Sequence, residues 1–156
     1  MYIPEILNNS LKNELVEIID IAKKMEDIKK YQFNSSATND EITILEKHLN
    51  YSLPKEYKDF LFFSNGMILN GFTAEFFNTN EIIDFYDRKK ADKFPNDYIV
   101  LAFLIGDGEV LCISRKTDKF IRYFDGEEQV FDSFKDVLSN IVNHIKVIEE
   151  DYLLED

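Results

Sequence analysis

Residues 38–66 read TNDEITILEKHLNYSLPKEYKDFLFFSNG, and this stretch predicts two consecutive amphipathic helices. The Thr38 hydroxyl can accept a hydrogen bond from the Glu41 amide while the Glu41 carboxylate reaches back, which is the spacing of a capping box. Pro54 suits the first turn of the second helix, because its missing N–H would have no intrahelical partner there. Gly66 suits the left-handed conformation that follows a helix end. The apolar residues that recur at helical spacing, and that we expect to be buried, are Ile42, Leu45, Leu49, Tyr57, Phe60 and Leu61.

The chain on the N-terminal side of this stretch predicts one more amphipathic helix, over residues 10–30. Its apolar side chains recur at steps of three and four, which stacks them on one face. Residues 33–37 break this pattern. The expected buried stripe of the helix is Leu11, Leu15, Ile18, Ala22 and Met25.

The chain after residue 66 predicts mainly strands. Residues 68–77 are strand-like with a bend at Gly71, and residues 80–88 predict a short helix with Asn80 as its cap. Asp-Gly pairs at 107–108 and 125–126 predict tight turns, because these residues tolerate positive φ angles. The remaining expected strands are residues 98–105, 109–114, 120–124 and 129–131.

Ser133 is expected to cap a final helix, which we expect to fray in the acidic segment after residue 148. Helices therefore come first, strands follow, and a helix ends the chain. This segregation indicates an α+β fold with a largely antiparallel sheet, N-terminal helices and a C-terminal helix. With 156 residues and no linker-like segment, residues 1–156 are expected to form a single domain.

The charge balance restricts the classes of partner. Lys and Arg number 18 against 30 Asp and Glu, which gives a net charge of −12. This charge argues against nucleic acid and against anionic membranes, and it favours a basic protein partner; solubility alone is the other explanation. Residues 1–9 lack the basic start and apolar run of a signal peptide, so we expect a cytoplasmic protein.

A search for catalytic chemistry finds no convincing constellation. His48 and His144 are the only histidines, and their spacing matches no metal-binding motif. Cys112 is the only cysteine and is expected to be a core residue, so no disulfide can form within the chain. No nucleophile elbow, phosphate-binding loop or dinucleotide fingerprint occurs. We therefore expect no catalytic residue, no metal ligand and no cofactor.

Acidic residues gather around the turns of the predicted strands. Paired carboxylates could do acid–base work, but acidic residues at this density mostly form a solvated face. The functional interpretation is a binding patch for a basic partner. Its expected members are Asp107, Glu109, Asp125, Glu127 and Glu128.

The motifs of residues 38–66 resemble the N-terminal block of the SUKH superfamily. That block combines an Ile-x-x-Leu-Glu helix, a Leu-Pro helix start, a Tyr-x-x-Phe-Leu face and a closing Asn-Gly, and all four occur here in this order. Further on, the hairpin at 105–108 and the Ser133-Phe134 start of the last helix are similar to later family motifs. The hairpin is one residue shorter or shifted relative to the family, and Ser114 stands where members often have Asp. The resemblance spans residues 38–142.

The resemblance implies helices packed on a curved sheet and a role without catalysis. In bacteria it implies an immunity protein that binds and neutralises a polymorphic toxin, often a nuclease and therefore basic. The fungal relatives, regulators of cell-wall glucan synthesis linked to killer-toxin resistance, imply a scaffold or regulatory module as the alternative. An enzyme that uses a carboxylate site is a third hypothesis.

Overall fold

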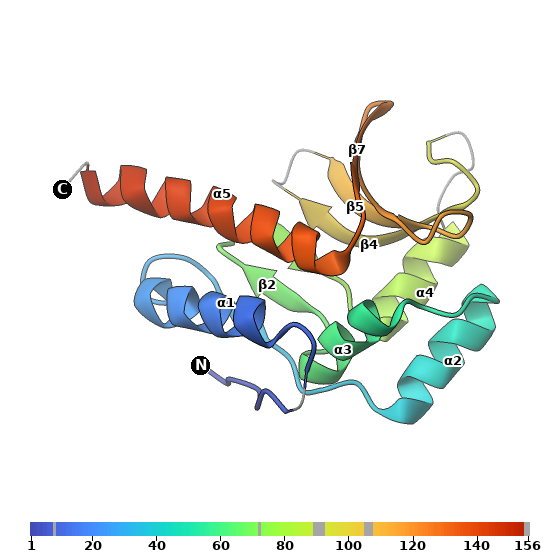
Figure 1. The fold of residues 1–156 in the computed structure, drawn as a ribbon, viewed down its shortest axis with the longest axis horizontal. Coiled ribbons are helices and arrows are strands. Elements are labelled where there is room, and N and C mark those ends of the chain that lie inside the picture. Colours follow the sequence, from blue (N-terminus) through green and yellow to red (C-terminus); the bar gives the residue numbers. More distant parts are fainter. Residues whose placement is uncertain (8, 72, 89–92, 105–107, 155–156) are drawn as a thin grey trace.

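The computed structural model describes residues 1–7, 9–71, 73–88, 93–104 and 108–154. In these ranges the chain forms five helices and seven strands (Figure 1). The helices are α1 (Lys12–Met25), α2 (Asn39–Leu49), α3 (Lys55–Phe63), α4 (Thr79–Arg88) and α5 (Phe134–Leu154). The strands are β1 (Gln32–Phe33), β2 (Met67–Leu69), β3 (Ala74–Phe76), β4 (Tyr98–Leu104), β5 (Glu109–Ser114), β6 (Phe120–Phe124) and β7 (Glu127–Phe131).

The strands form one curved sheet in which spatial order equals chain order, from β1 at one edge to β7 at the other. Every neighbouring pair is antiparallel. A register shift between Val100 and Ala102 interrupts the pairing of β4 with β5. This arrangement confirms the predicted α+β fold with N-terminal helices and a C-terminal helix.

The sheet has an inner face that packs on α3 and α5 and an outer face that packs on α4. On the inner face, Phe60 of α3 lies 5.2 Å from Phe76 and Phe134 of α5 lies 5.3 Å from Phe120, measured between ring centroids. On the outer face, Phe85 of α4 lies 5.9 Å from Phe103 of β4. Helix α1 packs beside α5, and α2 packs beside α4 (Figure 1). The aromatic side chains predicted for the core therefore meet at the inner face.

The capping box that opens α2 forms as its local sequence predicts, whereas the proline lies just before the helical turn that was expected to contain it. The Thr38 hydroxyl accepts a hydrogen bond from the Glu41 amide at 3.1 Å, and the Glu41 carboxylate accepts one from the Thr38 amide at 3.0 Å. Gly66 has φ +84°, and Pro54 occupies the N-cap of α3, one position before the first helical residue. All of the apolar residues expected to be buried in α1, α2 and α3 are buried.

The sequence-based bounds differ from the structure at several elements: α1 ends five residues earlier, and β7 begins two residues earlier, than expected. Helix α4 is capped by Asn78 and not by Asn80, because Asn78 and Glu81 exchange hydrogen bonds of 2.8 and 2.9 Å in a second capping box. Helix α5 continues to Leu154, beyond the expected fraying point. Strand β1 was not predicted, because two residues are too few to show the alternation of apolar and polar side chains that is typical of a strand. They form a strand only by pairing with β2.

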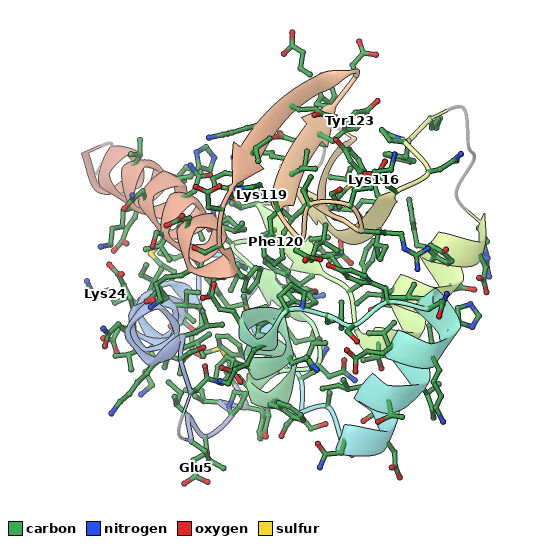
Figure 2. All side chains as sticks on the ribbon, turned by 45° about the vertical axis from the view of Figure 1, so that its right-hand side comes forward. Glu5, Lys24, Lys116, Lys119, Phe120 and Tyr123 are labelled. Atoms are coloured by element: carbon green, nitrogen blue, oxygen red, sulfur yellow. The ribbon has the colours of Figure 1, made fainter. Side chains whose placement is uncertain are left out.

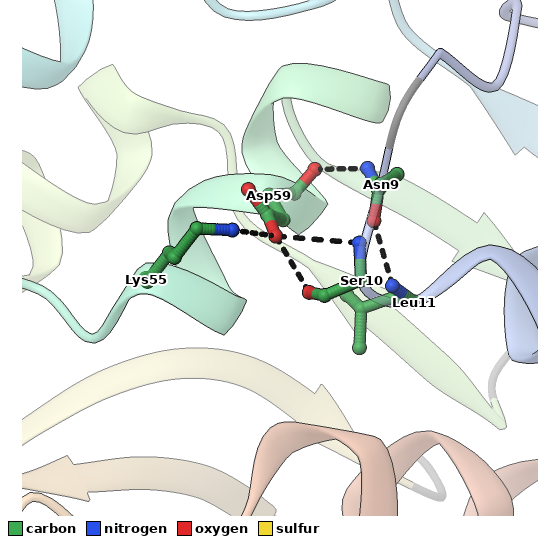
Figure 3. Close-up of polar contacts among 5 residues, drawn as sticks. All are labelled: Asn9, Ser10, Leu11, Lys55 and Asp59. Carbon is green, nitrogen blue, oxygen red and sulfur yellow. Dashed lines mark hydrogen bonds and ion pairs between the residues drawn. The ribbon is translucent and has the colours of Figure 1, made fainter.

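The segment before α1 is anchored to α3 through Asp59 (Figure 3). The Asp59 carboxylate accepts hydrogen bonds from the Ser10 hydroxyl at 2.5 Å and from Lys55 Nζ at 3.0 Å. The Asn9 side chain donates to the Asp59 carbonyl at 2.8 Å. Desolvation alone would raise the pKa of Asp59, but these hydrogen bonds outweigh it and hold the pKa below the usual 3.8. An ionised Asp59 therefore fastens the N-terminal segment to the domain.

Candidate functional site

The predicted acidic patch centres on the hairpin formed by β6 and β7, which projects from the body of the fold at the top of Figure 1. Asp125 and Gly126 connect the strands with φ values of 49° and 84°. Two consecutive positive φ values identify a type I′ turn, whose twist matches that of the flanking strands. Carboxylate side chains project from the tip of this hairpin (Figure 2).

Three of the predicted residues lie on this hairpin and are exposed: Asp125, Glu127 and Glu128. Glu128 accepts a hydrogen bond of 2.5 Å from the hydroxyl of Tyr98, which lies on β4. Burial and then this hydrogen bond raise the pKa of Tyr98, so the tyrosine remains a neutral donor at physiological pH. Within the described residues, no cation forms an ion pair with Asp125 or Glu127.

Glu109 differs from the other predicted residues because it is paired with a cation. Its carboxylate forms an ion pair with Arg122 of β6, and the side chains are only 15% and 19% exposed. Arg122 also donates to the Asn140 side chain of α5 at 3.0 Å. Glu109 thus contributes to the packing of β5, β6 and α5, and its charge is largely compensated. Asp107, the fifth predicted member, lies outside the described residues.

A shallow hollow of about 380 Å³ brings part of the predicted patch together. Glu109, Glu127 and Glu128 line it, with Arg122 among them, and Asp125 stands at the adjacent turn. The register of β6 with β7 sends Glu127 toward the inner side and Glu128 toward the outer side of the sheet. The Glu127 and Glu128 carboxylates therefore lie on opposite sides of the hairpin and do not converge as the two members of an acid–base pair would.

The structure adds an aromatic hollow that the sequence did not predict. It lies between α4 and the outer face of the sheet and has a volume of about 530 Å³. Phe103 of β4 is 40% exposed there, within 4.9 Å of the Phe77 ring and 5.9 Å of the Phe85 ring, measured between centroids. No sequence signal singles out Phe103, because it belongs to a continuous apolar run whose other members in β4 are buried.

The titratable residues that could support catalysis are dispersed. Among the described residues, no group of three or more His, Cys, Asp and Glu side chains could hold a metal ion. His48 pairs with Asp87 at 2.7 Å on the exposed surface between α2 and α4, and His144 is exposed on α5. Cys112 is fully buried in β5. In the part of the chain that the structure describes, no helix is long and apolar enough to span a membrane.

Comparison with known proteins identifies one family. The model of the SMI1 / KNR4 family (SUKH-1) matches residues 36–140. This range begins just before α2 and ends within α5. A comparison with curated proteins finds no significant match. The matched region contains the hairpin and the aromatic hollow, whereas α1 and the anchored N-terminal segment lie outside it.

Proposed function

Because the chain belongs to the SMI1 / KNR4 family (SUKH-1), we propose that it is an immunity protein, which binds and neutralises a cognate basic toxin without catalysis. The observation that supports this function is the projecting hairpin with its exposed carboxylates Asp125, Glu127 and Glu128. A toxin that degrades nucleic acid needs a basic active face to hold its substrate. An acidic hairpin can cover such a face, and the net charge of −12 accelerates the encounter.

The proposed contact surface is the predicted patch, with different contributions from its members. Asp125 and Glu127 offer carboxylates to the solvent, and Glu128 is oriented by the Tyr98 hydroxyl. Glu109 acts by holding Arg122 in the middle of β6, since its own charge is compensated. A charge-driven surface of this kind controls the association rate more than the lifetime of the complex.

The test starts with capture of partners on the tagged chain from lysate of its own cells, at low and then high salt. A captured basic protein is then produced in a test bacterium with and without this chain, and growth is measured. Rescue of growth by stoichiometric binding supports the immunity function. Capture of housekeeping proteins without any toxicity would instead support the regulatory module known from the fungal relatives.

A charge variant then tests the patch. Asp125→Asn removes one exposed charge and keeps a residue that tolerates positive φ at this position, and Glu127→Lys reverses a second exposed charge. We expect the association rate to fall about tenfold or more at low salt and its salt dependence to weaken. The matched control is Asp27→Asn with Glu26→Lys, which changes the net charge equally at an exposed site after α1. Equal effects of both variants would contradict a local patch.

A further inference from the structure

The two edges of the sheet differ in what they offer to another chain. The edge at β1 has only two residues, and short edge strands resist further pairing. The edge at β7 has five residues, Glu127–Phe131, and among the described residues only β6 pairs with it. The stretch contains no proline, and the Val130 side chain is 54% exposed. The β7 edge therefore lacks the devices that usually block strand addition, apart from its charge.

The type I′ turn determines which backbone groups of β7 point outward. In such a turn the residues that flank the two-residue loop, here Phe124 and Glu127, form a hydrogen-bonded pair. Hydrogen-bonded and non-hydrogen-bonded pairs alternate along an antiparallel ladder, so Gln129 and Phe131 also direct their backbone groups toward β6. The N–H and C=O groups of Glu128 and Val130 consequently face away from the sheet.

From this geometry we infer that the outer edge of β7 binds an extended, basic segment of a partner protein, which joins the sheet as a further strand. The inference deepens the proposed function and rests on it for the identity of the partner. Main-chain hydrogen bonds to Glu128 and Val130 supply the attachment, and neighbouring side chains supply the selectivity. Lys or Arg on the added strand lies beside Glu127 and Glu128, and an apolar residue lies beside Val130.

Charge decides between a partner protein and a second copy of this chain. A second copy would bring another net charge of −12 and another pair of glutamates to the same edge. Like charges on neighbouring strands destabilise pairing, whereas opposite charges stabilise it by roughly 0.2–1 kcal/mol per pair. The acidic edge thus excludes self-association and selects a basic segment.

A peptide experiment tests the edge without the natural toxin. The probes are a synthetic peptide with the core Val-Val-Thr-Lys-Lys and a control peptide in which glutamate replaces both lysines, each added to the intact chain at about millimolar concentration. In an antiparallel alignment along β7 this core places its lysines beside Glu127 and Glu128 and a valine beside Val130. Residue-resolved amide hydrogen exchange by NMR is the measurement. We expect the basic peptide to slow exchange at Glu128 and Val130, and to leave Gln129 little changed because its amide already faces β6. We also expect no dimer to form through the β7 edge in the absence of peptide.

Val130→Pro is the decisive variant, because it removes an outward N–H and leaves the ladder to β6 intact. The matched control Val130→Thr retains the N–H and a β-branched side chain. We expect Val130→Pro to weaken basic-peptide binding about tenfold or more, and Val130→Thr to preserve it. The exchange rates of the β6 amides report whether each variant keeps the hairpin folded, so a variant that loses the hairpin is replaced by N-methylation of Val130.

Four results would overturn the inference: no binding of the basic peptide, equal binding of both peptides, equal binding to wild type and Val130→Pro, or a dimer that protects the β7 edge. The outcome is separable from that of the proposed function. If the chain rescues growth but does not bind the basic peptide, the proposed immunity function is supported and the toxin binds another surface. If the basic peptide binds the β7 edge but no toxin is found, the inference about the edge is supported and the proposed function is contradicted.

Discussion

The inner face of the sheet and the tip of the β6–β7 hairpin share strand β6 but have opposite exposure. Strand β6 passes through both: Phe120 at its start is 2% exposed, and Phe124 at its end is 43% exposed. Around Phe120 lie the rings of Tyr57 and Phe134, with centroids at 6.1 and 5.3 Å. Around Phe124 lie the turn and the exposed carboxylates of β7.

This difference separates stability from recognition within one hairpin. The start of β6 is held by burial of aromatic surface, which supplies most of the stabilisation of a small domain. The tip is held by the turn and by the ladder between β6 and β7, so its side chains are not needed for packing. Substitutions should therefore divide into those that unfold the chain and those that alter only binding.

The largest expected effect comes from Phe134→Ala, which opens a cavity among Tyr57, Phe60 and Phe120. We expect the free energy of unfolding to fall by about 3–5 kcal/mol, measured by urea denaturation. Phe124→Ala is the matched control on the exposed tip, and we expect it to lower that free energy by less than about 1 kcal/mol. Similar losses for both substitutions would show that the hairpin tip belongs to the core.

The next effect compares two glycines with the same φ of +84°, Gly66 and Gly126. A Cβ at Gly66 would lie 2.8 Å from the backbone nitrogen of Asn78 and 2.8 Å from the carbonyl oxygen of Phe76, whereas a Cβ at Gly126 meets nothing within 4 Å. We expect Gly126→Ala to cost about 1–2 kcal/mol through backbone strain alone. Gly66→Ala adds a backbone collision and should cost about 3 kcal/mol or more. Thermal unfolding measures both, and a smaller loss at Gly66 would contradict the close packing seen there.

The smallest effect concerns Asp59, which anchors the N-terminal segment outside the family match. Because its folded pKa lies below the usual 3.8, the ionised carboxylate stabilises the fold above about pH 4, and this contribution disappears as the pH falls through the folded pKa. We expect Asp59→Asn to reduce the free energy of unfolding by about 1–2 kcal/mol at pH 7.

The acid dependence provides the control for this anchor. The difference in the free energy of unfolding between wild type and Asp59→Asn should become smaller as the pH drops below 3.8. Urea denaturation across the acid range measures this difference. Asp20→Asn removes an exposed carboxylate of α1 and should stay within about 0.5 kcal/mol of wild type at each pH. If this difference in the free energy of unfolding is the same at every pH, the charge of Asp59 does not contribute to holding the N-terminal segment.

Much of the fold was predictable because its signals are local. The Thr38 capping box, the apolar stripes of α1 to α3 and the Asp125-Gly126 turn each depend on residues a few positions apart. The cap of α4 could also have been predicted, since Asn78 and Glu81 have the same capping-box spacing as Thr38 and Glu41. The family resemblance likewise depends on ordered local motifs, and the match over residues 36–140 confirms it.

The candidate site was less predictable because its geometry depends on neighbouring strands. The sequence indicated that the turns are acidic. It did not indicate that Glu109 forms an ion pair with Arg122, because these residues come together only when β5 pairs with β6. The exposure of Phe103 depends on how far α4 covers the outer face, which no periodicity encodes.

The helices, the Asp125-Gly126 turn, the acidic charge and the family could be inferred from the amino-acid sequence, since each follows from short-range spacing or composition. Which edge of the sheet stays unpaired, and which of its charges are compensated, became evident from the three-dimensional arrangement of the described residues. Both depend on what packs or pairs from distant parts of the chain. Local sequence specifies the turn that leads into β7, whereas the availability of β7 to a partner depends on its outer edge, beside which the described chain places no second strand.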